Sequence, residues 1–227
     1  MTHILCIETA TDICSVCLAT NGKMVAIRET ARSFSHTEVI TVFIRECLAE
    51  AKLTMGDLSA VAVTSGPGSY TALRIGSSTA KGICFALDIP LIAVDTIKSL
   101  AQGVREHAEK GDLIIPLLDA RRMEVYCAVY DHELVEKQIV SPIILDENTF
   151  SDLERSGTIH LCGDGVDKSK SLLSLDRAVF HASEASAKNM IPEAFRRFSS
   201  NEFEHLVNYT PYYFKGPNIT VQKKNIL

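Results

Sequence analysis

The sequence is poor in several features that would indicate particular classes of protein. Its 227 residues include no tryptophan, and 28 acidic residues outnumber 23 basic ones, for a net charge of −5. This balance argues against a chain that binds nucleic acid by itself, because such binding needs a basic face. No apolar stretch approaches the ~20 residues of a membrane span. The first residues lack the basic start and apolar run of a secretory signal, so we expect a cytoplasmic chain with no membrane contact.

Common catalytic and metal-binding motifs are also missing. No pair of the seven histidines has helical metal-ligand spacing, and there is no H-E-x-x-H, no G-x-S-x-G and no phosphate loop ending in Gly-Lys-Ser/Thr. The seven cysteines lie in apolar segments, which is typical of buried thiols in a reducing compartment. Cys14 and Cys17 form a C-x-x-C, but on a strand they would point to opposite faces. The sequence therefore lacks a complete set of catalytic parts.

What the sequence does contain is an alternation of apolar strands and helices. Three strands joined in part by the turn Asn21-Gly22 are followed by a helix over 35–53, with Ser35 and Glu38 in position for a capping box. A strand, a helix and a strand come next, which favours parallel pairing with right-handed crossovers. After Gly111 a strand-rich and then helical plan begins again. We therefore predict an α/β fold with two units, residues 1–110 and 111–227.

A glycine-rich loop joins a strand to a helix in the segment VTSGPGSYTALRIG, residues 63–76. Gly66 and Gly68 permit backbone conformations that other residues resist, Pro67 stiffens the turn, and Ser69 can cap the following helix. The amides at the start of that helix could accept an anion. No cation in the loop would hold a phosphate, however, so an anion site and a rigid turn remain open alternatives.

Two helical faces could contact either a partner or the chain's own sheet. The first is a line of small side chains at every fourth position: Ala72, Gly76 and Ala80. The second is the wide apolar arc of the first helix, which includes Ile40, Phe43 and Cys47. Periodicity defines each face without defining what covers it.

Acidic residues end three apolar strands, at Glu8, Asp95 and Asp119. Such positions often serve functional sites, although a solvated strand end has the same pattern. His36 lies beside the expected helix cap and is interpreted as a surface polar residue.

Five segments together resemble the TsaB (YeaZ) family, in order over roughly residues 3 to 130: ILCIETAT, SHTEVI, SGPGSYTALRIG, GICFALDIPLIAVDT and LLDARRMEVYCAVY. The resemblance implies an actin-like ATPase fold, related to ribonuclease H, in two similar subdomains. It also implies a role in the threonylcarbamoyl modification of adenosine in certain tRNAs (t6A formation). The chain would be a non-catalytic subunit that pairs with the metal-binding transferase TsaD as a heterodimer. The ATPase TsaE would join them, and tRNA would be bound only through the complex.

The resemblance also implies roles for particular residues. Active members of the fold begin with an Asp-x-Gly phosphate turn, and this chain has Glu8-Thr9-Ala10 there. We therefore expect no catalytic residue, no metal and no required cofactor, with any nucleotide bound weakly or shared with the partner. The expected remnants of a nucleotide site are Glu8, Thr9, Gly66, Pro67, Gly68, Ser69 and Asp119. The expected partner interface on the helices of the first subdomain is His36, Ile40, Phe43, Cys47, Ala72, Arg74, Gly76 and Ala80.

Two other hypotheses remain open. The chain could be an enzyme of the same fold, either an ATP-dependent small-molecule kinase or a peptidase. It could instead be a scaffold that forms a homodimer through the same helices.

Overall fold

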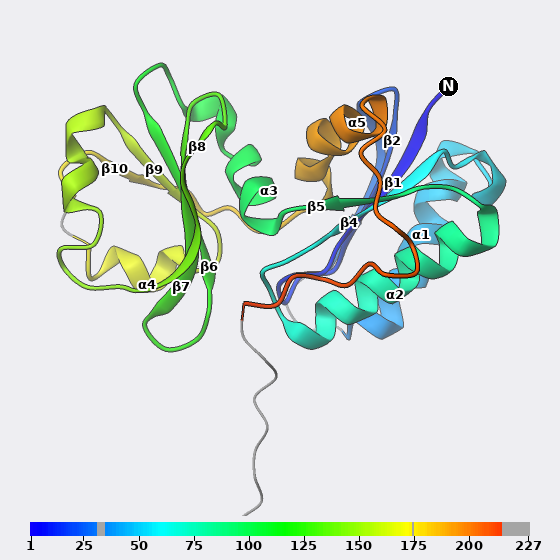
Figure 1. Ribbon diagram of the computed structural model, residues 1–227, viewed down its shortest axis with the longest axis horizontal. Helices are drawn as coiled ribbons and strands as arrows, with labels where there is room; N and C mark the ends of the chain where they lie inside the picture. Colours follow the sequence, from blue (N-terminus) through cyan, green and yellow to red (C-terminus); the bar gives the residue numbers. More distant parts are fainter. Residues whose placement is uncertain (31–34, 174, 215–227) are drawn as a thin grey trace, which may run out of the picture.

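The computed structural model describes residues 1–30, 35–173 and 175–214. They form two five-stranded sheets that lie side by side along the long axis of the molecule, each with its own helices (Figure 1). Within these residues no helix is long and apolar enough to cross a membrane.

The first sheet has the strand order β3-β2-β1-β4-β5. Strands β1 (His3–Glu8), β2 (Ser15–Thr20) and β3 (Lys23–Glu29) are antiparallel, and the predicted Asn21-Gly22 turn has positive φ at both residues. Strand β4 (Ala60–Thr64) pairs in parallel with β1, and β5 (Leu91–Val94) pairs in parallel with β4. Strands β4 and β5 are buried throughout, as expected for unbroken apolar runs in a sheet covered on both faces.

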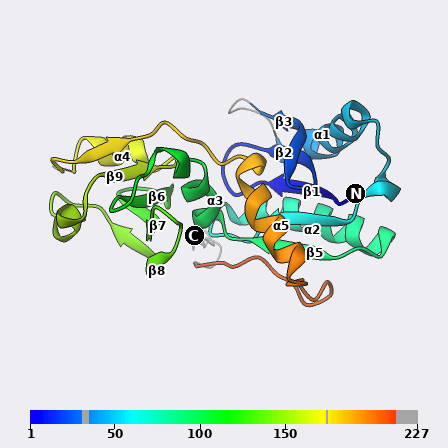
Figure 2. The same cartoon turned by 90° about the horizontal axis from the view of Figure 1, so that it is seen from above.

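Helices cover both faces of the first sheet. On one face, α1 (His36–Ala51) and α2 (Tyr70–Leu87) pack on Leu5, Ile7 and their neighbours. On the other, α5 (Ile191–Ser199) packs on Ile4 and Cys6, and Figures 1 and 2 show it opposite the helix pair. The predicted capping box of the first helix is not formed: Ser35 makes no side-chain cap bond and its hydroxyl instead contacts that of Thr37 at 2.6 Å.

The second sheet repeats the plan of the first. Strands β6 (Leu113–Asp119), β7 (Glu124–Asp131) and β8 (Glu136–Ile144) are antiparallel. Strands β9 (Ile159–Cys162) and β10 (Ala178–Phe180) continue the sheet in parallel, giving the order β8-β7-β6-β9-β10. The same order and directions in both sheets confirm the predicted two similar subdomains.

Short helices complete the described chain. Helix α3 (Thr96–Gln102) lies between the two sheets and packs on β6, as Figure 2 also shows, and α4 (Val166–Lys170) follows β9. The 3₁₀ turns are η1 (Met55–Asp57), η2 (Arg105–His107), η3 (Ser151–Ser156) and η4 (Ala187–Met190).

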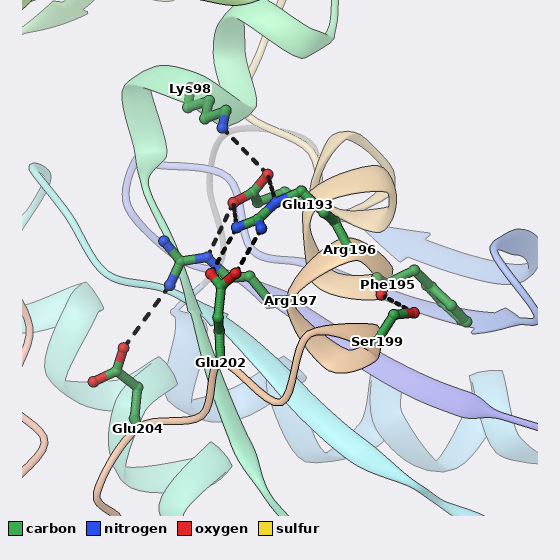
Figure 3. Close-up of polar contacts among 8 residues, drawn as sticks. All are labelled: Lys98, Glu193, Phe195, Arg196, Arg197, Ser199, Glu202 and Glu204. Carbon is green, nitrogen blue, oxygen red and sulfur yellow. Dashed lines mark hydrogen bonds and ion pairs between the residues drawn. The ribbon is translucent and has the colours of Figure 1, made fainter.

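The last part of the described chain returns to the first sheet, which differs from the expected single unit over 111–227. Apolar residues of η4 and α5 enter the core beside β1 and β5, and Glu204 forms a β-bridge to Leu91. An ion-pair network supports this return (Figure 3): Glu193 contacts Lys98 at 3.2 Å, Arg196 at 2.9 Å and Arg197 at 3.0 Å. Burial opposes ionisation of Glu193, but these cations outweigh it and lower its pKa to about 2. The network therefore fastens α5 to α3.

Candidate functional site

A cleft of about 570 Å³ lies between the two subdomains. Its walls include Gly68 and Ser69 from the first subdomain, Asp119 and Asp164 from the second, and Tyr213 from the C-terminal segment. The cleft brings together several of the predicted site residues, whereas others lie away from it.

The Gly-Pro-Gly loop is packed from both sides. Gly66 has φ +104°, and a Cβ at this position would overlap the carbonyl oxygen of Tyr212. A Cβ at Gly68 would lie 2.6 Å from the carbonyl oxygen of Ala10. The amide of Ser69 donates to that same oxygen at 2.7 Å, so one amide at the start of α2 is already used within the chain. The loop thus needs both glycines for close backbone approach.

Glu8 ends β1 but faces the interior rather than the cleft. Its side chain is fully buried; Oε1 accepts from the amide of Ala10 at 2.7 Å, and Oε2 has no hydrogen-bond partner among the described residues. Burial raises its pKa to about 7, although the hydrogen bond from Ala10 and the nearby polar groups of Thr64 and Thr9 lower it. Thr9 is also fully buried, beneath Gly76. Neither residue is placed to contact a ligand in the cleft.

Asp119 ends β6, the strand that corresponds to β1, and its side chain does line the cleft. Its Oδ1 accepts from the amide of Arg121 at 2.5 Å and from Lys168 Nζ at 2.8 Å. Its own amide donates to Asp164 Oδ1 at 2.8 Å. Burial raises the pKa of Asp164, and the charges of Asp119 and Asp12 raise it further. This wall of the cleft is therefore acidic, with Lys168 and Arg121 close by.

Asp95 has a structural position. It is the N-cap of α3, where Oδ1 accepts from the amide of Lys98 at 2.8 Å, and burial raises its pKa to about 6. In the described part of the chain, no group of three or more His, Cys, Asp or Glu is arranged to hold a metal ion.

Sequence reasoning missed Asp164, Arg121 and the aromatic residues that line the cleft. A signal for Asp164 was present, because Gly163-Asp164-Gly165 follows β9 as Gly66-Pro67-Gly68 follows β4. The rings of Tyr213 and Tyr70 are in contact but tilted by 43°, with ring centroids 4.6 Å apart. No local pattern links these two, since they are distant in the sequence.

Most of the expected partner interface lies inside the chain instead. The residues concerned are buried against the first sheet or its turns: Ile40, Cys47, Ala72, Gly76 and Ala80. A Cβ on Gly76 would overlap Thr9 Oγ1, so the line of small side chains serves the approach of α2 to the end of β1. His36 and Phe43 are half-buried and Arg74 is exposed. The expectation that the small-residue face meets a partner is therefore corrected.

A different face of α2 is open. Phe85 is 80% exposed, and Arg74 lies over the ring of Tyr70 with 5.5 Å from Cζ to the ring centroid. A shallow hollow of about 490 Å³ beside Arg74 runs between α2 and the start of α1 at Thr37.

The repeated sheet plan and the intervening cleft define an actin-like, two-subdomain α/β protein. The structure is similar to YeaZ from Pseudomonas aeruginosa, with a TM-score of 0.81 and 23% identity, over 94% of this chain and 100% of that one. The family model described as "TsaD: tRNA N6-adenosine threonylcarbamoyltransferase" matches residues 28–221.

Curated relatives carry the name "tRNA threonylcarbamoyladenosine biosynthesis protein TsaB". The Escherichia coli protein is 29% identical over 228 residues, covering 94% of this chain and 95% of that protein. The Haemophilus influenzae protein is 35% identical over 123 residues, so the match spans 54% of this chain and about half, 51%, of that relative. The chain belongs to the TsaB (YeaZ) family.

Proposed function

We propose that this chain acts in the formation of threonylcarbamoyladenosine in tRNA, as a subunit that pairs with TsaD and does not carry out the transfer. The names of the relatives and of the family model support the pathway. TsaE would join the pair, and tRNA would be bound through the complex, in keeping with the net charge of −5.

The proposal that the chain is non-catalytic rests on the turn after β1, whose polar groups are already used within the chain. A phosphate turn must offer free amides and a reachable carboxylate. Here the carbonyl oxygen of Ala10 accepts a hydrogen bond from the amide of Ser69, and the carboxyl group of Glu8 is buried beneath the turn. A nucleotide would therefore bind this chain weakly and is not required by it.

The open face of α2 supports the pairing part of the proposal. Phe85 offers a large apolar side chain and Arg74 a cation within one face of an 18-residue helix. Aromatic and arginine side chains are those that most often dominate protein interfaces. We assign the TsaD contact to this face, together with the hollow beside Thr37.

The test compares two exposed apolar residues on different subdomains. Phe85→Lys should abolish pull-down of TsaD and threonylcarbamoyladenosine formation by the reconstituted proteins. Ile139→Lys is the matched control, since Ile139 is 75% exposed on β8 of the second subdomain. Lysine near the C-terminal end of α2 is compatible with the helix, so the melting temperature should not change. Equal pairing by the two variants would contradict the assigned face.

The alternatives predict other outcomes. A kinase or peptidase would turn over ATP or casein as the purified chain alone, and ATP turnover that is lost in Glu8→Ala would contradict the non-catalytic proposal. A homodimeric scaffold would keep its size on dilution and would not exchange its partner for TsaD. Light scattering with and without TsaD separates that case.

A further inference from the structure

The last described part of the chain contacts both subdomains within a few residues. Leu206 and Tyr209 pack on the apolar core between the first sheet and the helix pair α1 and α2, and Tyr209 is buried. Phe214, five residues later, packs on the core between α3 and the second sheet, with its ring centroid 5.1 Å from that of Tyr126 in β7. Residues 209–214 are termed the C-terminal strap, and Figure 1 shows them running past α2 toward the middle of the molecule.

Hydrogen bonds fix the strap and the residues before it to the first subdomain. Lys81 Nζ, in the C-terminal half of α2, donates to the carbonyl oxygens of Val207 and Tyr209 at 3.2 and 3.0 Å. The amide of Tyr212 donates to the carbonyl oxygen of Ser65 at 2.6 Å, in the loop that precedes α2. The strap therefore follows α2 back to the start of the helix.

Tyr70, the first residue of α2, is in contact with the strap. Its ring meets that of Tyr213, with centroids 4.6 Å apart. Arg74 lies over the same tyrosine ring, and its Nη1 donates to Tyr70 Oη at 3.3 Å. Tyr70 also lines both the cleft and the hollow beside Arg74. The position of Arg74 on the open face of α2 thus depends on a ring that the strap supports.

The strap adds a third connection between the subdomains. The main chain itself crosses between them twice, through α3 and through residues 181–186. The third connection is made by the ring of Phe214 alone, beside the cleft that Tyr212, Tyr213 and Phe214 line. A segment held by so few contacts can open locally while both cores stay folded.

We propose that the C-terminal strap holds the two subdomains at the present width of the cleft and holds the start of α2 in position for a partner. When the strap is released, the subdomains become free to move about α3 and residues 181–186, and Tyr70 loses the support of Tyr213. A partner bound beside Arg74 favours the held state, because binding shifts an equilibrium toward the state that the ligand prefers. This last step rests on the proposed pairing with TsaD.

The distance between the subdomains, measured by pulsed electron paramagnetic resonance on the full chain without TsaD, tests the strap. Spin labels on cysteines introduced at Thr41 of α1 and Ser171 after α4 report this distance, since both positions are exposed and the native cysteines are buried. Phe214→Ala should raise the population of separated subdomains by about twofold to tenfold, the range expected when one aromatic pair is lost. Phe203→Ala is the matched control, because its ring partner Phe198 lies in the same subdomain.

An unchanged distance distribution in Phe214→Ala would overturn the proposal, and so would equal broadening by Phe203→Ala. If Phe214→Ala does not fold, Phe214→Leu makes the same test, because it removes the ring and keeps an apolar side chain.

The affinity for TsaD tests the link to the partner face. Tyr213→Leu should weaken TsaD binding by about twofold to tenfold with little change in melting temperature, and Tyr213→Phe, which keeps the ring, should bind more tightly than Tyr213→Leu. Phe203→Ala should bind as the unmodified chain does. Equal affinities of Tyr213→Leu and the unmodified chain would overturn the link. If the unmodified chain does not bind TsaD, the proposed function fails, whereas the distance measurement still decides whether the strap holds the subdomains.

Discussion

The two subdomains share a sheet plan and differ in the helix after the fourth strand. In the first, β4 leads through Gly66-Pro67-Gly68 into α2, which has 18 residues. In the second, β9 leads through Gly163-Asp164-Gly165 into α4, which has five. The last glycine of each loop nonetheless lies against the backbone of the first strand or its turn, Gly68 on Ala10 and Gly165 on Leu117. Close backbone approach is therefore a property of the shared plan, whereas helix length varies independently of it.

The acidic residues that end the first strand of each sheet, Glu8 of β1 and Asp119 of β6, also differ in their surroundings. Glu8 is fully buried and its pKa is raised to about 7, whereas Asp119 is partly exposed and pairs with Lys168. Two acids at equivalent strand ends therefore have different surroundings and different partners: Glu8 is buried beneath the turn, and Asp119 is paired with a cation.

The largest expected effect concerns the packing of α2, whose counterpart in the second subdomain, α4, has only five residues. Gly76→Leu should destabilise the fold by about 3 kcal/mol or more, because the added side chain overlaps Thr9. Gly82→Leu on the same helix is the control, since a Cβ there meets nothing within 4 Å. Urea unfolding followed by circular dichroism measures both. Similar midpoints for the two variants would mean that α2 does not approach β1 closely at Gly76.

Glu8→Gln should change the pH dependence of stability. The pKa of Glu8 is raised from 4.5 to about 7 on folding, so its contribution is fully present below pH 4.5 and is lost as the pH rises through 7. Glutamine does not ionise, so the variant does not lose this contribution. Between pH 4.5 and 8 its free energy of unfolding should therefore rise, relative to that of the unmodified chain, by up to about 3 kcal/mol. Unfolding free energies at both pH values give the difference. A constant offset would show that Glu8 does not titrate on folding.

The glycine comparison can be sharpened by adding a methyl group to each loop. Gly68→Ala should lower the free energy of unfolding by about 1–3 kcal/mol, because the added Cβ would lie 2.6 to 2.9 Å from three atoms of Ala10. Gly165→Ala should cost less, since its closest contacts are 2.9 and 3.0 Å. Gly56→Ala, with a single contact at 3.8 Å, is the control for both. The reverse order of melting temperatures would contradict the equivalence of the two loops.

The strands, the first turn and the two similar halves could be predicted from the sequence, because apolar alternation and Asn-Gly turns are local signals. The buried face of α2 could not, since periodicity groups Ala72, Gly76 and Ala80 on one side without saying what covers them. The return of α5 to the first sheet could not be predicted for a similar reason, because an apolar helix face does not specify which of two similar sheets it packs on. His160 and His181, whose ring nitrogens lie 2.9 Å apart, meet through tertiary contacts between segments far apart in the sequence, so no local pattern predicts this pair.

The smallest expected effect tests the carboxylate of the second subdomain. Asp119→Asn removes the ion pair with Lys168, whose atoms are 2.8 Å apart, but the Asp119 side chain is 44% exposed. Ion pairs of this kind contribute at most about 1 kcal/mol, and the asparagine oxygen can still accept from the amide of Arg121. We therefore expect a loss below about 1 kcal/mol that shrinks further in 1 M salt, measured by urea unfolding at pH 7. Lys168→Met should lose more than Asp119→Asn, because Lys168 also donates to the carbonyl oxygens of Arg122 and Glu124. If Asp119→Asn instead cost as much as Gly68→Ala, the acidic end of β6 would be a structural element of the fold, and the contrast drawn with Glu8 would fail.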